Sequence, residues 1–185
     1  RQHQMCIRDR TRAFPIPGLA EVAIGMKTVE EAVSVRNWVL ERIEVASVLD
    51  DPDARRRALT VVVVGGGFAG VETISELEDM AREAVNRNDR LSVSDLRFVM
   101  IEAAPRIMPE VPEDRAEKVV AELRARGIEV LLNTSLSDAT DGHLQLINMT
   151  DKSPAGEMDT DTLIWTAGVA ASPMLKNTDF PIDER

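Results

Sequence analysis

Residues 60–72 read TVVVVGGGFAGVE, and this stretch predicts the fold. The β-branched run Thr60–Val64 is typical of a strand buried on both faces of a parallel sheet. Gly65, Gly67 and Gly70 then satisfy the pattern G-x-G-x-x-G. Apolar residues follow at three- and four-residue steps, namely Val71, Ile74, Leu77, Ala81 and Ala84. A strand, a glycine turn and a helix in this order indicate a dinucleotide-binding fingerprint.

The three glycines have separate expected roles. Gly65 permits the tight turn, Gly67 lets the backbone approach a pyrophosphate, and Gly70 lets the helix pack closely on the strand. The free N–H groups and the dipole at the start of the helix favour an anion there. The alternative reading of the same glycines is a tight turn in some other α/β protein.

The fingerprint also calls for an acid at the end of the second strand. The run Leu96–Ile101 reads LRFVMI, and Glu102 closes it. A carboxylate there can accept hydrogen bonds from the ribose hydroxyls of NAD and repel the 2′-phosphate of NADP. Glu102 lies 32 residues after Gly70, beyond the usual spacing of about 20, and a long polar connection after Asn86 accounts for the excess. Two alternatives stay open: Arg106 could accommodate a phosphate, and Glu102 could be a solvated loop carboxylate.

Composition limits the classes of function. The 185 residues carry 44% hydrophobic residues and a formal net charge of −10, which suits one soluble domain with a sizeable core. The negative charge argues against nucleic acid or an anionic membrane surface as the main partner. No apolar stretch approaches the roughly 20 residues of a membrane span. The single cysteine excludes an internal disulfide, and the two distant histidines lack metal-ligand spacing, so no metal site is predicted.

Other signals order the remaining elements. Thr28 and Glu31 form a capping box that opens a helix, and the polar segment that follows it, through Arg57, reads as a linker. Pro112 opens another helix, which Gly127 ends. Strands at residues 128–132 and 162–166 and short alternating segments between them complete the pattern. The predicted class is α/β: a Rossmann-type NAD(P)-binding domain over about residues 58–168 with a small antiparallel β-meander, to which residues 14–51 do not belong by pattern.

The two ends of the chain are abrupt. Residues 5–10 read MCIRDR, and their back-translation, ATG-TGT-ATA-AGA-GAC-AG, matches a transposon adapter used in library preparation. We therefore expect residues 1–10 to be a non-native segment. The last residues, PIDER, complete no element, so we expect an internal piece of a longer protein.

Four stretches point to a family. They are FPIPGLAEVAIGMKTVEEAVSVRNWVLE from residue 14, VVVVGGGFAGVETISELEDMA from residue 61, IEAAPRIMP from residue 101 and LIWTAGVAASPML from residue 163. In this order and at these spacings the chain resembles the type II NADH dehydrogenases, single-chain flavoproteins that pass electrons from NADH to quinone. It is most similar to their actinobacterial members.

The resemblance implies a division of the chain and a set of site residues. Residues 11–57 would be the tail of an FAD domain with a linker helix, residues 58–166 the NADH-binding domain, and residues 167–185 the start of the return to the FAD domain. Glu72 would be the catalytic acid beside the nicotinamide, although acids are favoured in the first turn of any helix. The resemblance implies these cofactor-binding residues: Gly65, Gly66, Gly67, Phe68, Ala69 and Gly70 at the pyrophosphate, Glu102 with Ala103 and Arg106 at the adenosine ribose, and Ala167 and Gly168 where the backbone passes the flavin and quinone.

This chain departs from the family pattern in three places. The FAD glycine motif, the later Gly-Asp segment that contacts FAD, and the C-terminal helices that attach these enzymes to the membrane are absent from it. We therefore assign FAD binding, quinone reduction and peripheral attachment to the cytoplasmic side of the plasma membrane to the intact protein, and expect this segment alone to be inactive. The resemblance is compatible with a homodimer.

Two other classes of protein stay open. One is another two-domain flavoprotein, such as a ferredoxin or disulfide reductase. The other is a non-catalytic NAD-binding module. A redox-active cysteine pair upstream would favour the first, and NADH binding without electron transfer would favour the second.

Overall fold

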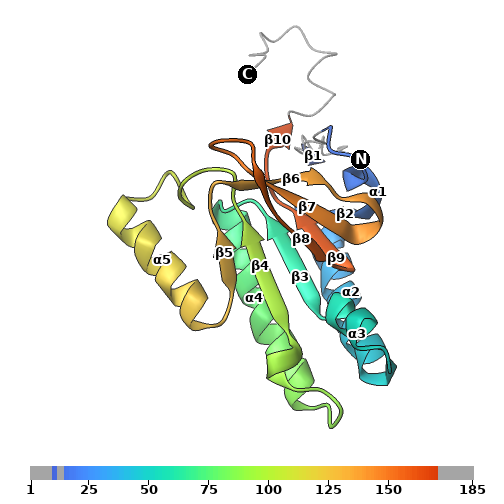
Figure 1. Cartoon of the computed structure of the whole chain (residues 1–185). Helices are drawn as coiled ribbons and strands as arrows, with labels where there is room; N and C mark the ends of the chain where they lie inside the picture. The colour runs from blue at the N-terminus through green and yellow to red at the C-terminus, as the bar shows by residue number, and fades with distance from the viewer. Residues whose placement is uncertain (1–9, 12–14, 171–185) are drawn as a thin grey trace, which may run out of the picture.

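The computed structural model describes residues 10–11 and 15–170. The expected adapter-derived segment, apart from Arg10, and the expected return segment beyond Ala170 lie outside these residues. A five-stranded parallel sheet forms the centre of the molecule (Figure 1). Its strands, in spatial order, are β2 (Ala23–Gly25), β9 (Thr162–Trp165), β3 (Thr60–Val64), β4 (Arg97–Ile101) and β5 (Glu129–Leu131). A short antiparallel pair joins β1 (Arg10–Thr11) to β10 (Val169–Ala170).

Helices α2 to α5 cover one face of this sheet, and a second sheet together with the short helix α1 covers the other. The helices are α1 (Leu19–Val22), α2 (Val29–Val48), α3 (Pro52–Ala58), α4 (Phe68–Asn86) and α5 (Glu113–Ala125), with 3₁₀ turns η1 (Val93–Asp95) and η2 (Thr140–Gly142). The second sheet is antiparallel, with strands β6 (Thr134–Asp138), β7 (His143–Asn148) and β8 (Pro154–Asp159). None of the helices among the described residues is both long and apolar enough to cross a bilayer.

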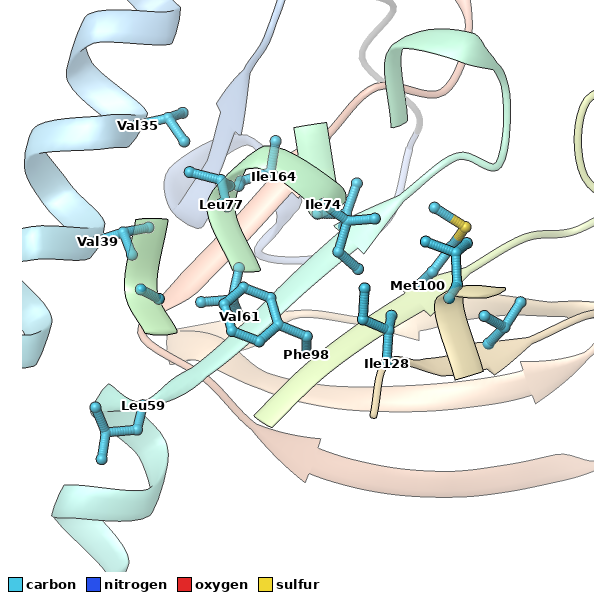
Figure 2. Packing of buried hydrophobic residues seen from close by; sticks show 14 of the residues in the cluster. Val35, Val39, Leu59, Val61, Ile74, Leu77, Phe98, Met100, Ile128 and Ile164 are labelled. Carbon is cyan, nitrogen blue, oxygen red and sulfur yellow. The ribbon is translucent and has the colours of Figure 1, made fainter. Parts of the chain in front are cut away.

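Alternation along β3 divides the core into two layers. Val61 and Val63 face α2 and α4, where they pack with Ile74 and Leu77 (Figure 2). Val62 and Val64 belong to a separate cluster, which includes the buried leucines of β6 and β7. Because both faces of β3 are covered, every residue of the strand is apolar or β-branched, as the sequence indicates. The predicted α/β class with an additional antiparallel meander is confirmed.

Helix α4, which follows the glycine turn, is held by a buried carboxylate as well as by apolar packing. Glu78 is 3% exposed. It accepts hydrogen bonds from Arg82, one turn further along α4, and from Arg126 at the end of α5. A buried carboxylate needs such partners because an unpaired one would be strongly destabilising. The pairing therefore fixes α4 relative to α5.

Two features differ from the sequence-based expectation. The segment 50–57, predicted to be a linker, contains α3, because Asp51 caps the helix through the N–H of Asp53 and Pro52 occupies its first position. The segment 14–51, predicted to lie outside the Rossmann domain, contributes β2 to the edge of the same sheet through parallel pairing with β9. Helix α2 from that segment packs its buried residues Val35 and Val39 into the core shared with α4 (Figure 2).

Candidate functional site

The glycine turn lies at the carboxyl end of β3. Gly65 has a φ of +115°, a conformation that residues with a side chain rarely adopt. Its N–H donates to the carbonyl of Ile101 at 2.9 Å, so the turn begins beside the end of β4. A Cβ at Gly65 would lie 2.5 Å from the hydroxyl of Thr166 and 2.8 Å from the nitrogen of Ala167. The turn therefore has no room for a side chain at Gly65.

The third glycine of the motif brings helix and turn into contact. A Cβ at Gly70 would lie 1.8 Å from the carbonyl oxygen of Gly65, which is backbone and cannot move aside without moving the turn. Gly70 is buried. Its position explains why α4 can start directly over the turn.

Gly67 has a different environment from the other two. It is the N-cap of α4 in an extended conformation, and no side chain caps the helix. A Cβ at Gly67 would meet no atom within 4 Å, and the next two residues, Phe68 and Ala69, are exposed. The first N–H groups of a helix lack intrahelical partners. The start of α4 is therefore an open cradle that can accept an anion.

Glu102 lies beside this cradle and is already hydrogen-bonded. The carboxylate accepts a hydrogen bond from the N–H of Gly66 at 2.5 Å and another from the N–H of Ala104 at 2.7 Å. A Cβ at Gly66 would lie 3.0 Å from the carboxylate and 2.7 Å from the Ile107 side chain. Each carboxylate oxygen has further acceptor capacity, and Glu102 is only half-buried. Ala103, which follows it, is exposed.

Arg106 is engaged by its own loop. Its guanidinium donates to the carbonyls of Pro109 at 2.6 Å and Val111 at 2.9 Å. The side chain also lines a cavity of about 280 Å³ against α5. These bonds order the loop after Glu102, and the predicted contact of Arg106 with a cofactor stays a prediction.

Glu72 lies on α4 beyond its first turn, which contains no acidic residue. The general preference for acids in a first helical turn therefore does not explain its position. Glu72 is exposed and lines a cavity of about 440 Å³ between α2 and α4, together with Met26, Ala69 and Leu77. No hydrogen bond or ion pair within the described part of the chain places Glu72 in the glycine turn, so its catalytic role stays a prediction.

Ala167 and Gly168 run beside the glycine turn. They follow β9, where the N–H of Thr166 donates to the carbonyl of Val64 at 2.9 Å. The carbonyl of Ala167 accepts a hydrogen bond from the indole of buried Trp165 at 2.7 Å, and Gly168 has a φ of +72°. The structure thus brings the carboxyl ends of β3, β4 and β9, and the predicted residues that follow them, together at one edge of the sheet.

The sequence did not indicate Thr166 as a site residue. Its hydroxyl lies 2.9 Å from the carbonyl oxygen of Val64 and 3.2 Å from that of Gly65. A threonine that ends an apolar run carries no recognisable motif. Its position becomes evident only when β9 is placed next to β3 in the sheet.

Several known proteins have sequences similar to this chain. The chain is 30% identical to a probable NADH dehydrogenase of Dictyostelium discoideum, over 96% of this chain and 38% of that protein. It is 34% identical to the type II NADH:quinone oxidoreductase NdhA of Mycobacterium tuberculosis, over 85% of this chain and 33% of that protein. The chain thus spans about a third of the length of the curated relatives it matches. These relatives confirm the resemblance to the type II NADH dehydrogenases.

A solved structure agrees with the fold. NDH2 from Plasmodium falciparum, in a complex with NADH, superposes with a TM-score of 0.83 at 23% identity, over 89% of this chain and 34% of that one. The family model described as pyridine nucleotide-disulphide oxidoreductase matches residues 9–185. Since that match covers nearly all of the sequence, the chain belongs to the pyridine nucleotide-disulphide oxidoreductase family.

Proposed function

We propose that this chain binds NADH at the carboxyl edge of its parallel sheet. The pyrophosphate lies against the glycine turn, Gly65–Gly70, and the start of α4. The adenosine ribose hydroxyls donate to Glu102, flanked by Ala103 and Arg106. In the intact protein this segment belongs to an NADH:quinone oxidoreductase that passes hydride from NADH to FAD and electrons on to quinone.

One observation carries the proposal: the open cradle at Gly67 lies next to a pre-oriented carboxylate. The extended backbone, the absence of a capping side chain and the free space around a Cβ at Gly67 suit a bulky anion. The bond from the N–H of Gly66 holds Glu102 beside that cradle. The relatives named NADH dehydrogenase and NADH:quinone oxidoreductase support NADH as the dinucleotide.

The residues of this chain act mainly by position and charge. The helix start neutralises the pyrophosphate, and Glu102 orients the adenosine half, so that the nicotinamide end extends past Glu72 and residues 167–168. The flavin of the intact protein, when bound, supplies the two-electron carrier between NADH and quinone. Residues 167–185 would lead back to the domain that holds it, and residues 11–57 would lead in from that domain. Peripheral attachment to the cytoplasmic side of the membrane is proposed for the intact protein alone.

The direct test of the proposal is calorimetric titration of the 185-residue chain with NADH. Saturable binding, weak but competed by NAD⁺, is expected because the pyrophosphate and ribose contacts lie within this chain. Heat changes equal to those of NADH diluted into buffer, at millimolar NADH and with a folded protein by circular dichroism, would contradict it.

The chain is expected to prefer NADH to NADPH by at least roughly tenfold in Kd. Two unit charges 4 Å apart repel by about 4 kcal/mol at a surface-like dielectric, and screening leaves part of this. Glu102→Gln should reduce the ratio of the Kd for NADPH to the Kd for NADH. The matched control is Glu122→Gln, which removes an exposed carboxylate of α5. Equal Kd values for both cofactors in the unmodified chain would remove Glu102 as the selecting residue.

The 185-residue chain is expected to show no NADH:quinone turnover and to retain no flavin. Its sequence holds one glycine fingerprint, whereas the reaction needs a second dinucleotide site for the flavin between NADH and quinone. The chain is incubated with excess FAD, passed through gel filtration and assayed with a soluble quinone, with a full-length relative as positive control. Stoichiometric flavin with turnover above buffer would overturn this assignment.

A further inference from the structure

Thr166 is a buried polar residue that the proposed binding function does not yet use. It is 9% exposed and directly follows β9. Its hydroxyl can donate to the carbonyl of Val64, at 2.9 Å, or to that of Gly65, at 3.2 Å. Both carbonyls belong to the point where β3 becomes the glycine turn. The hydroxyl therefore contacts the backbone of the turn from the neighbouring strand.

The same hydroxyl also occupies the space that two motif glycines leave free. A Cβ at Gly65 would lie 2.5 Å from Thr166 Oγ1, and a Cβ at Gly70 would lie 2.9 Å from it. The turn, the start of α4 and Thr166 thus form one packed unit. An apolar side chain at residue 166 could fill this space, but it could not bind the two carbonyls.

We propose that Thr166 is a positioning residue for the phosphate-binding turn. Its hydroxyl holds the carbonyls of Val64 and Gly65 so that the N–H groups at the start of α4 face the ligand. The Glu102 carboxylate holds the same turn from the β4 side through the N–H of Gly66. The proposal rests on the NADH-binding function for its effect on affinity, but its effect on the turn is independent of any ligand.

The same Thr→Val substitution at two residues separates the effect of the Thr166 hydroxyl on the turn from the effect of packing. Thr166→Val removes the hydroxyl and nearly keeps the volume of the side chain. The matched control is Thr162→Val: Thr162 is fully buried at the start of β9, the strand that Thr166 follows, and its hydroxyl has no hydrogen-bond partner among the described residues. Thr166→Ser restores the hydroxyl without the methyl group. All three variants are made in the 185-residue chain.

The first readout is amide hydrogen exchange of residues 65–70 without ligand, where the N–H groups of Gly65 and Gly66 are held by hydrogen bonds to Ile101 and Glu102. The second readout is the Kd for NADH by calorimetry. Thr166→Val should exchange faster in this segment and bind NADH roughly five- to tenfold more weakly, the equivalent of one net hydrogen bond. Thr162→Val should match the unmodified chain in both readouts, and Thr166→Ser should recover most of the affinity.

The outcomes separate the positioning role of Thr166 from the proposed binding of NADH. Unchanged exchange and affinity in Thr166→Val would overturn the positioning role, as would equal losses in Thr162→Val. Suppose that neither the unmodified chain nor any variant binds NADH, but Thr166→Val alone shows faster amide exchange in residues 65–70. The positioning role then stands, and the NADH-binding function is wrong. If Thr166→Val unfolds, Thr166→Ser is compared with Thr166→Ala instead. Faster exchange of residues 65–70 in Thr166→Ala than in Thr166→Ser supports the role of the hydroxyl, whereas equal exchange in these two variants overturns it.

Discussion

Gly67→Val is expected to keep the fold and lose at least roughly a hundredfold in affinity for NADH, since charge-assisted hydrogen bonds are worth about 1.5–3 kcal/mol each and two or more would be lost. The new side chain would occupy the open space in front of α4, where the pyrophosphate is proposed to lie. It would meet no protein atom within 4 Å, and the extended φ and ψ of Gly67 suit a β-branched residue. Calorimetric titration of the variant measures the loss.

The matched control is Gly67→Ala, whose smaller side chain should give an intermediate Kd. Both variants should unfold at the same urea concentration as the unmodified chain. The corresponding substitution in a full-length relative should raise the KM for NADH. An unchanged Kd in Gly67→Val would remove Gly67 from the binding site.

Gly70→Ala is expected to have the opposite effect, a loss of more than about 3 kcal/mol in the free energy of unfolding, at the upper end of overpacking costs. The added Cβ would lie 1.8 Å from the carbonyl oxygen of Gly65. This clash can be removed only if α4 moves away from the turn. Such a movement would separate Ile74 and Leu77 from the core. Because native domains are stable by about 5–15 kcal/mol, the variant should unfold at a much lower urea concentration, as followed by circular dichroism.

Gly67→Ala serves as control here too, because it adds the same methyl group three residues away in the same motif. Equal urea midpoints for Gly70→Ala and Gly67→Ala would show that α4 does not depend on the close contact with Gly65.

Local signals in the sequence were sufficient for the elements that carry the motif. The β-branched run predicted β3 at its observed bounds, and the capping box of Thr28 and Glu31 predicted the start of α2, with both reciprocal hydrogen bonds present. The helix after the glycine turn ends at Asn86, as expected. These elements are determined by periodicity and caps within a few residues, which single-sequence reasoning can detect.

Elements determined by distant partners were missed. Strand β2 has only three residues, and what makes it a strand is its pairing with β9, far along the chain.

The short helix α3 was missed for a local reason. Its seven residues are mostly polar, which is typical of a linker, although the proline after Asp51 was a usable start signal.

The candidate site shows the same division. The glycines and Glu102 were predicted from their place after apolar runs. The hydrogen bonds of Glu102 to Gly66 and of Thr166 to the turn could not be predicted, because they depend on how far β3, β4 and β9 extend relative to one another. The sequence left open whether Arg106 accommodates a phosphate, and its bonds to its own loop follow from the course of residues 106–111.

The spatial order of the parallel sheet has a consequence for folding during synthesis. Strand β9 lies between β2 and β3, yet it is the last of the five strands to leave the ribosome. Until Thr162–Trp165 emerge, β2 has no partner in this sheet, and β3 exposes one edge. Such edges can pair with other chains, and non-local parallel pairing is slow to form. We therefore expect the nascent chain to be most prone to pairing with other chains in the interval before Thr162–Trp165 emerge.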